Sequence, residues 1–439
     1  MSHRQFAPLD YVIFGACLFI SIGIGVYHAF KGRHHKTTNE YYFGGKTMGA
    51  IPVTLSLIVT YQSSVFLLGM PAELYVYGTM FMWILVGVSI GFVLISLLIA
   101  PLLHPLDIKT VYQYLELRYN HHAPRKLASF LGLVVVAIYL GLVLYGPAIA
   151  LVTVTGFPIW GSFVVVAVGV ILYTSIGGYR AVIWADVFQF CIIIVGLLSI
   201  LIKGLMSLKE LNFLTVAKES GRIDFTEISF DPTVRHTVWG LVIGNAFHFF
   251  SLGYSQLIVQ RILSCKNTSI SKRSVRSTIP GFIVFWTSTC TLGLMAFSYF
   301  YERGCDPLKS KMIKSPNQIL PYFVMNIFEE VPGLPGLFLA ALFSATISTL
   351  SSGLNSLPII TWEDFLKPII PTVSDGKTLL IGKCLVILYG GLAIGIAYII
   401  LHTGGPILQV TQATFGCING PVVGMFILGA TFRCANYKT

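Results

Sequence analysis

The sequence contains little charge. Asp, Glu, Lys and Arg together make up 11% of its 439 residues, whereas a typical soluble protein carries about 25%. Hydrophobic residues reach 55%, and the mean hydropathy is +0.78. A soluble fold of this size needs far more charge to cover its surface. The composition therefore excludes a soluble protein and predicts a polytopic membrane protein.

Motifs of nucleotide-driven and metal-dependent chemistry are also missing. The sequence has no G-x-x-x-x-G-K-[ST] loop, so the chain by itself is not expected to be an ATP-driven pump. No His or Cys residues have metal-ligand spacing. Most of the eight cysteines lie in apolar segments and do not form a secreted disulfide framework. We expect no enzyme and no cofactor.

The net charge of +11 does not indicate a nucleic-acid-binding protein. Such a protein gathers Lys and Arg on one face or element, whereas the 29 basic residues here are scattered in short clusters between apolar stretches. This distribution is typical of a membrane protein that is oriented by its cytoplasmic loops. We therefore expect a lipid bilayer as the partner, and no nucleic acid.

Eleven apolar segments are long enough to cross a bilayer, whose core of about 30 Å requires roughly 20 residues per helix. The runs are continuous and lack the alternation of a barrel strand, which predicts an all-α protein. The segments lie near residues 9–30, 50–70, 77–103, 127–152, 158–177, 181–206, 236–262, 279–301, 318–355, 378–402 and 406–432.

The basic residues predict how the segments are oriented. With an extracellular N-terminus, 19 of the 29 Lys and Arg residues fall in cytoplasmic loops, among them Arg180 and Arg261. This arrangement obeys the positive-inside rule, and the opposite one violates it. The C-terminus is then cytoplasmic. With no arginine expected inside the membrane, an anionic solute would have to be recognised by the N-termini of half-helices.

Two spans are unusually polar. The second carries Thr60-Tyr-Gln-Ser-Ser64 at mid-membrane, which is costly unless these groups line a cavity or pair internally. The ninth repeats serine every four residues, at Ser344, Ser348, Ser352 and Ser356. Small-residue packing could explain both features. We favour a Na⁺ site, because Na⁺ prefers oxygen ligands and an unwound helix supplies free carbonyls.

Asp186 lies about a turn and a half inside the sixth span. An ionisable residue at that depth is a candidate functional residue, here a second cation site. The alternative is that Asp186 pairs with nearby Arg180 or a lysine and only anchors the end of the helix.

Five motifs resemble the sodium/solute symporter family, closest to the branch of the multivitamin, monocarboxylate and iodide transporters. The resemblance covers practically the whole chain, in the same order and spacing. It rests on Gln62-Ser-Ser…Leu68-Gly-Met-Pro-Ala-Glu73, on Tyr173-Thr-Ser-Ile-Gly-Gly178…Ala181-Val-Ile-Trp-Ala-Asp186, on Val259-Gln-Arg-Ile-Leu-Ser264, on Pro332-Gly-Leu-Pro-Gly-Leu-Phe338 and on Ser344-Ala-Thr-Ile-Ser-Thr349.

The resemblance implies one transmembrane domain over residues 1–439, with about eleven helices in a LeuT-like inverted repeat. An extra first helix at 9–30 would precede two five-helix halves at 50–206 and 236–432, and the second span would be broken at its centre. The last helices of the family are absent, since relatives continue through two or three more.

The resemblance also implies site residues. Sodium would be held by backbone carbonyls near Val59, Gln62 and Ala345 and by the hydroxyls of Ser348 and Thr349. Asp186 matches an aspartate that is implicated in a second sodium position in some members. The solute would lie at mid-membrane near four aromatic residues, namely Phe66, Tyr139, Trp239 and Phe415.

The predicted function is a Na⁺-coupled symporter in the plasma membrane, either monomeric or a weak homodimer, with Na⁺ as the coupling ion. Its solute would be a small organic anion, a monocarboxylate or a vitamin such as biotin or pantothenate. Phe66 stands where the iodide transporter carries glutamine, which favours an organic solute over the alternative of an iodide symporter. A second alternative is a non-transporting solute sensor or partner subunit of the same fold.

Overall fold

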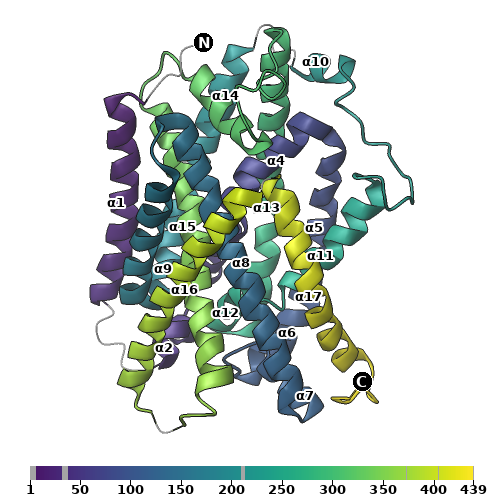
Figure 1. Ribbon diagram of the computed structural model, residues 1–439. Coiled ribbons are helices and arrows are strands. Elements are labelled where there is room, and N and C mark those ends of the chain that lie inside the picture. The colour runs from purple at the N-terminus through teal and green to yellow at the C-terminus, as the bar shows by residue number, and fades with distance from the viewer. Residues whose placement is uncertain (1–5, 32–37, 209–212, 372, 404, 439) are drawn as a thin grey trace.

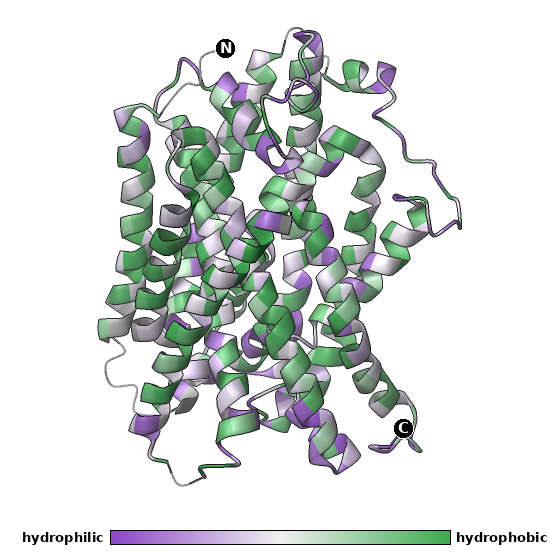
Figure 2. Ribbon diagram, in the orientation of Figure 1, coloured by the Kyte–Doolittle hydropathy of each residue, from purple (hydrophilic) through white to green (hydrophobic). Residues whose placement is uncertain are grey.

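The computed structural model describes residues 6–31, 38–208, 213–371, 373–403 and 405–438. Throughout these residues the regular structure is helical, apart from one isolated bridge between Met48 and Cys265. Apolar residues dominate the middle of the helix bundle, and hydrophilic residues gather at its two ends (Figure 2). The predicted all-α class is confirmed.

Within the described part of the chain, eight helices are long and apolar enough to cross a membrane, or nine with one bent pair. This makes the protein a multi-pass membrane protein. The eight are α1 (Pro8–Lys31), the run Thr79–Leu106 around α5 (Ile84–Leu94), α8 (His122–Thr155), the second part of α9 (Ile159–Ser207), α13 (Thr268–Glu302), α15 (Leu334–Ile360) with its extension to Leu366, α16 (Asp375–Thr403) and α17 (Ile407–Thr431). Two shorter apolar helices, 159–172 and 240–252, coincide with two further predicted spans.

The second predicted span is broken, as the resemblance implies. It forms α3 (Ala50–Tyr61) and α4 (Ser64–Tyr77), which meet at 54°. The break occurs where Gln62 and Ser63 leave helical geometry, with Ser63 fully extended. The seventh span is interrupted in the same way between α11 (Asn245–Leu252) and α12 (Gln256–Ser264), where Ser255 is extended.

The prediction of one continuous span over 318–355 is wrong. The structure separates a short α14 (Ile319–Ile327) from α15 (Leu334–Ile360). Between them lie Pro332 and Gly333, and Gly333, directly before α15, has φ +99°, a conformation outside helical geometry that glycine adopts readily. Pro335 then occupies the first turn of α15, where proline is favoured because its missing N–H needs no partner.

α15 lies at the centre of the bundle, with nearly all of its residues buried. It packs against α9, α8, α3 and α1, and α1 runs along one edge of the bundle (Figure 1). The beginning of α1 is held by Asp10, whose carboxylate accepts the amides of Gly333 and Gly336 at 2.7 and 3.2 Å. Only glycine fits at position 336, since a Cβ there would lie 2.2 Å from the Asp10 carbonyl oxygen.

Candidate functional site

The break between α3 and α4 exposes backbone oxygens in the middle of the bundle. The carbonyls in the last turn of a helix have no intrahelical donor. One of them, the Thr60 carbonyl, accepts the Thr349 hydroxyl of α15 at 2.9 Å, and the same hydroxyl lies 3.1 Å from the Ala345 carbonyl. Val59 and Ala345 are completely buried beside it. Four of the five residues predicted for Na⁺ therefore meet where α3 packs on α15.

The fifth predicted residue, Gln62, lies at the break itself. Its side-chain oxygen accepts the indole N–H of Trp286 at 2.8 Å, and among the described residues its amide nitrogen has no partner. Trp286 in turn stacks on Phe66, with ring centroids 4.9 Å apart. The break between α3 and α4 is thus hydrogen-bonded, through Gln62, to the stacked rings of Trp286 and Phe66.

Asp186 does not anchor the end of a helix. Its carboxylate is completely buried on α9, where it accepts the Ser348 hydroxyl at 2.6 Å and also the Ser56 hydroxyl. The alternative of a pair with Arg180 is wrong, because Arg180 donates to Thr47 instead, at an exposed position. Both residues follow the kink of α9 at Gly178, where φ is +63°, so they lie on the same straight part of the helix but have different partners.

The partner of Asp186 is Arg261, whose side chain is 1% exposed. Its Nη2 lies 3.1 Å from the Asp186 Oδ2. The prediction that Arg261 belongs to a cytoplasmic loop is wrong, because Arg261 lies on α12 and is buried inside the helix bundle, where no arginine was expected. A signal was available, since Arg261 lies inside the predicted seventh span, with Leu257-Ile-Val259 shortly before it and Ile262-Leu263 after it, and an ionisable residue in such a segment is a candidate functional residue.

The guanidinium of Arg261 is surrounded by acceptors. Nε donates to the Ser56 hydroxyl at 2.9 Å, Nη1 to the Leu257 carbonyl at 2.9 Å, and Nη2 to the hydroxyls of Ser352, at 2.6 Å, and Thr60. One buried ion pair therefore connects α3, α9, α12 and α15. Of the hydroxyls bonded to this ion pair, those of Ser348 and Ser352 belong to the serine stripe, and that of Thr60 belongs to the polar run of the second span.

A narrow cavity lies between the two broken helices. Its volume is about 30 Å³, room for about one water molecule, so an organic solute requires α4 and α12 to move apart. Three of the four predicted solute residues line it, namely Phe66, Tyr139 and Phe415. Trp239 does not, because it is 42% exposed, stacks on Phe230 and donates to the Ile228 carbonyl.

Polar residues that were not predicted as solute contacts also line the cavity, among them Tyr61 and His248. Tyr61 is 7% exposed, and among the described residues its hydroxyl has no hydrogen-bond partner. His248 presents its ring beside Phe415, at 5.8 Å between centroids. The position of Tyr61 next to Gln62 could have indicated that Tyr61 lies at the cavity. Nothing in the sequence around His248 distinguishes it from a residue that only packs in the core.

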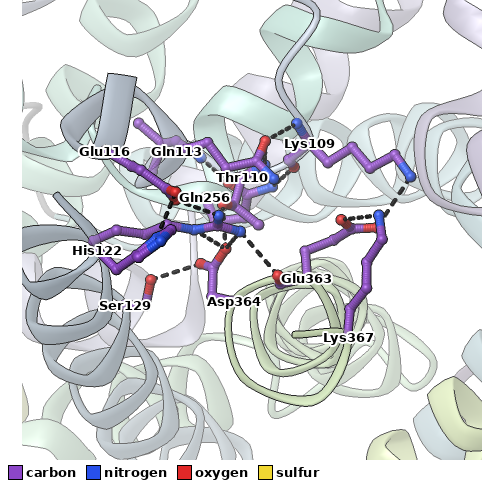
Figure 3. A network of polar contacts seen from close by, with 12 residues as sticks. Lys109, Thr110, Gln113, Glu116, His122, Ser129, Gln256, Glu363, Asp364 and Lys367 are labelled. Carbon is purple, nitrogen blue, oxygen red and sulfur yellow. Dashed lines mark hydrogen bonds and ion pairs between the residues drawn. The ribbon is translucent and has the colours of Figure 1, made fainter. Parts of the chain in front are cut away.

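A second buried ion-pair network lies at the α7 end of the bundle (Figure 3). Arg125 of α8 donates to Asp364 and, at 2.6 Å, to Glu116 of α7 (Gln113–Tyr119). The hydroxyls of Thr110 and Ser129 also reach Asp364, at 2.9 and 2.6 Å. Burial raises the pKa of the Glu116 carboxyl, but the hydrogen bond and charge of Arg125, together with His122, outweigh burial and hold that pKa below its usual range. This network ties the end of α15 to α7 and α8.

Asp364→Ala should lower the free energy of unfolding by about 3–5 kcal/mol, because it leaves Arg125 partly buried with one countercharge fewer. Denaturant unfolding in detergent micelles measures this. Asp107→Ala is the matched control, since Asp107 pairs with Lys46 but its side chain is 87% exposed, and an exposed pair contributes about 0–1 kcal/mol. Equal effects of the two substitutions would contradict a stabilising role for the buried network.

Comparison with known proteins identifies the family. The model of the Sodium:solute symporter family matches residues 41–438. The chain belongs to this family. It is 37% identical to sodium-coupled monocarboxylate transporter 2 of Bos taurus, over 100% of this chain and 71% of that relative. It is 38% identical to the sodium-dependent multivitamin transporter of Oryctolagus cuniculus, over 98% of this chain and 68% of that relative.

A solved structure has the same fold. A Na⁺-coupled sialic acid symporter, captured in a substrate-bound outward-open state, superposes with a TM-score of 0.87 over 99% of this chain and 89% of that one, at 23% identity. The family predicted from the motifs is confirmed, and with it sodium-coupled solute symport with Na⁺ as the coupling ion.

Proposed function

We propose that this symporter carries a small organic anion, either a monocarboxylate such as lactate or nicotinate or a vitamin such as biotin or pantothenate. The observation that carries the proposal is the cavity at the two helix breaks. Its aromatic walls suit an apolar solute body, and the Tyr61 hydroxyl offers an uncommitted donor to a carboxylate. Relatives matched over nearly the whole chain are named for monocarboxylates and for multivitamin transport.

We propose that Na⁺ binds between α3 and α15, held by the carbonyls of Val59, Gln62 and Ala345 and by the hydroxyls of Ser348 and Thr349. The cluster fits a hard cation, because Thr349 already brings its oxygen within about one hydrogen-bond length of two carbonyls, those of Thr60 and Ala345. A second Na⁺ would bind at Asp186, whose carboxylate is within 2.6 Å of the Ser348 hydroxyl.

The proposed architecture is a single domain of eleven spans in a LeuT-like inverted repeat preceded by α1. The two interrupted spans, α3–α4 and α11–α12, stand at corresponding places in the two proposed halves, which supports the repeat. α1 begins at one end of the bundle and the chain's C-terminal end lies at the other (Figure 1), as an odd number of spans requires. We propose a plasma-membrane protein with an extracellular N-terminus and a cytoplasmic C-terminus, monomeric or a weak homodimer.

Coupling would arise because Na⁺ stabilises the state that binds the solute. Such coupling is reciprocal and typically amounts to about 1–3 kcal/mol. Inward movement of Na⁺ is favourable by about 2.3 kcal/mol per charge per 100 mV. Since the proposed Na⁺ ligand Val59 belongs to α3 and the cavity is lined by Thr60 and Tyr61 of the same helix, one rearrangement of α3 would affect both sites.

The decisive experiment is uptake of lactate, nicotinate, biotin, pantothenate and iodide into cells or proteoliposomes, with Na⁺ and with Na⁺ replaced by choline. We expect at least one of the four organic anions to accumulate against its gradient only with Na⁺, and iodide not to accumulate. Na⁺-dependent binding without accumulation would instead indicate a solute sensor or partner subunit. Accumulation of iodide alone would contradict the proposed solute class.

Tyr61→Phe should weaken solute binding without destabilising the protein. Removing an unpaired buried hydroxyl leaves the free energy of unfolding unchanged or raises it by about 1 kcal/mol. A lost hydrogen bond to a carboxylate should raise the KM of the transported anion about tenfold or more. Tyr119→Phe is the control, because its hydroxyl donates to the Met425 carbonyl away from the cavity. An unchanged KM in Tyr61→Phe would remove Tyr61 from the solute site.

A further inference from the structure

Asp186 lies between two potential cations. One of its oxygens accepts Ser348, a proposed Na⁺ ligand, and the other accepts the Arg261 guanidinium at 3.1 Å. The carboxylate is completely buried and Arg261 is 1% exposed. A Na⁺ ion at Asp186 would therefore stand within a few ångströms of a second positive charge that water does not screen.

One carboxylate cannot fully neutralise both cations. Arginine stays protonated in proteins, so Arg261 cannot relieve the repulsion by losing its proton. Without Na⁺, the guanidinium is the countercharge that keeps Asp186 from being buried unpaired, which is a strongly unfavourable arrangement. With Na⁺ on the carboxylate, the guanidinium and the ion repel each other.

We propose that the guanidinium of Arg261 is the resident cation of this site and competes with Na⁺ for Asp186, so that Na⁺ binding releases Arg261. The inference rests on the proposed Na⁺ position at Asp186. After release from Asp186 the guanidinium would still have hydrogen-bond acceptors, because its other hydrogen bonds go to Ser56, Thr60, Ser352 and the Leu257 carbonyl.

The released residue belongs to the helix that forms one wall of the solute cavity. Leu257 and Ile258 of α12 line that cavity, and Arg261 follows one turn later on the same helix. While Arg261 is paired with Asp186, α12 is tied to α9, and through Ser56 and Thr60 it is tied to α3. Na⁺ binding would break the ion pair between Arg261 of α12 and Asp186 of α9, and so allow α12 to move away from the narrow cavity.

The test is equilibrium ²²Na⁺ binding to the purified full chain in lipid nanodiscs, without solute. Arg261→Gln removes the competing charge and should lower the Na⁺ Kd about tenfold, within the range of about 5–150-fold that couplings between protein sites commonly reach. Arg261→Lys keeps the competing charge, so its Kd should stay within about threefold of wild type. Arg276→Gln is the matched control, because Arg276 donates to Ser96 and does not contact Asp186.

An Arg261→Gln protein that is folded but binds Na⁺ no more tightly than wild type would overturn the competition while leaving the proposed Na⁺ site intact. Absence of Na⁺ binding to the wild type would overturn the proposed site itself, and the competition with it. These two failures are therefore distinguishable.

A measurement on the wild-type protein avoids any folding defect of the variant. Hydrogen exchange followed by mass spectrometry, in NaCl against KCl at equal ionic strength, should show faster exchange in α12 with Na⁺, because its tie to α9 is released. Peptides from α3 and α15 should exchange more slowly, because the ion joins them. Unchanged or slower exchange of α12 in Na⁺ would overturn the proposal.

Discussion

Replacing Ser348 and Thr349 together by alanine should abolish Na⁺-dependent uptake and leave the amount of protein at the cell surface unchanged. Both hydroxyls lie where α15 packs on the broken end of α3, and Thr349 is hydrogen-bonded to the Thr60 carbonyl. A hydrogen bond to a charged group contributes about 1.5–3 kcal/mol. With similar contributions from two hydroxyl ligands, the double substitution should weaken Na⁺ binding at least about 100-fold.

The control for this experiment is Thr346→Ala on the same helix. Thr346 is equally buried, but its hydroxyl bonds only the Leu342 carbonyl one turn back. It should keep Na⁺-dependent uptake near the wild-type rate. Uptake measured at several Na⁺ concentrations, together with surface biotinylation, separates lost ion binding from lost trafficking. Wild-type Na⁺ activation in the double variant would exclude these hydroxyls as ligands.

Asp186→Ala should destabilise the protein strongly, by about 3–5 kcal/mol in the free energy of unfolding, because it leaves Arg261 buried without a countercharge. Asp186→Ala combined with Arg261→Met should recover most of that loss, since replacing both members of a buried pair by apolar groups is often close to neutral. Neither variant should bind a second Na⁺.

Denaturant unfolding of the two proteins in detergent micelles measures the difference. If the free energy of unfolding of Asp186→Ala is within about 1 kcal/mol of wild type, the buried charge of Arg261 does not need Asp186. Its hydrogen bonds to Ser352 and Thr60 would then be enough to stabilise it. A double variant less stable than Asp186→Ala would contradict the ion pair as the source of the loss.

Hydropathy predicted the apolar helices well because membrane insertion depends on the composition of each segment alone. It joined α14 to α15 because the residues on either side of Pro332 and Gly333 are both apolar, and a window average does not detect a turn. Composition also could not indicate that Trp239 lies outside the cavity while Tyr61 faces it, since both are aromatic residues in predicted spans.

Part of the candidate site could be predicted from the sequence. The serine repeat indicated a hydroxyl face that contains Ser348, because residues four apart share a helix face, whereas the assignment of Ser348 and Thr349 as Na⁺ ligands came from the family resemblance. Arg261 was missed because the positive-inside rule assigns basic residues to loops, and the predicted boundary of the seventh span passed beside it.

The sequence by itself determined that the chain is an all-helical membrane protein with a polar second span and a stripe of hydroxyls, because these properties depend on residue type and spacing. Only the tertiary structure decided which charges meet. Asp186 is paired with Arg261, 75 positions away along the chain, and not with Arg180, six positions away. The packing of α9 against α3 and α15, with α12 alongside, brings the side chains of Asp186 and Arg261 together. In a low-dielectric interior an unpaired charge is strongly unfavourable, so a buried charge pairs with the opposite charge that packing places beside it, however distant in sequence.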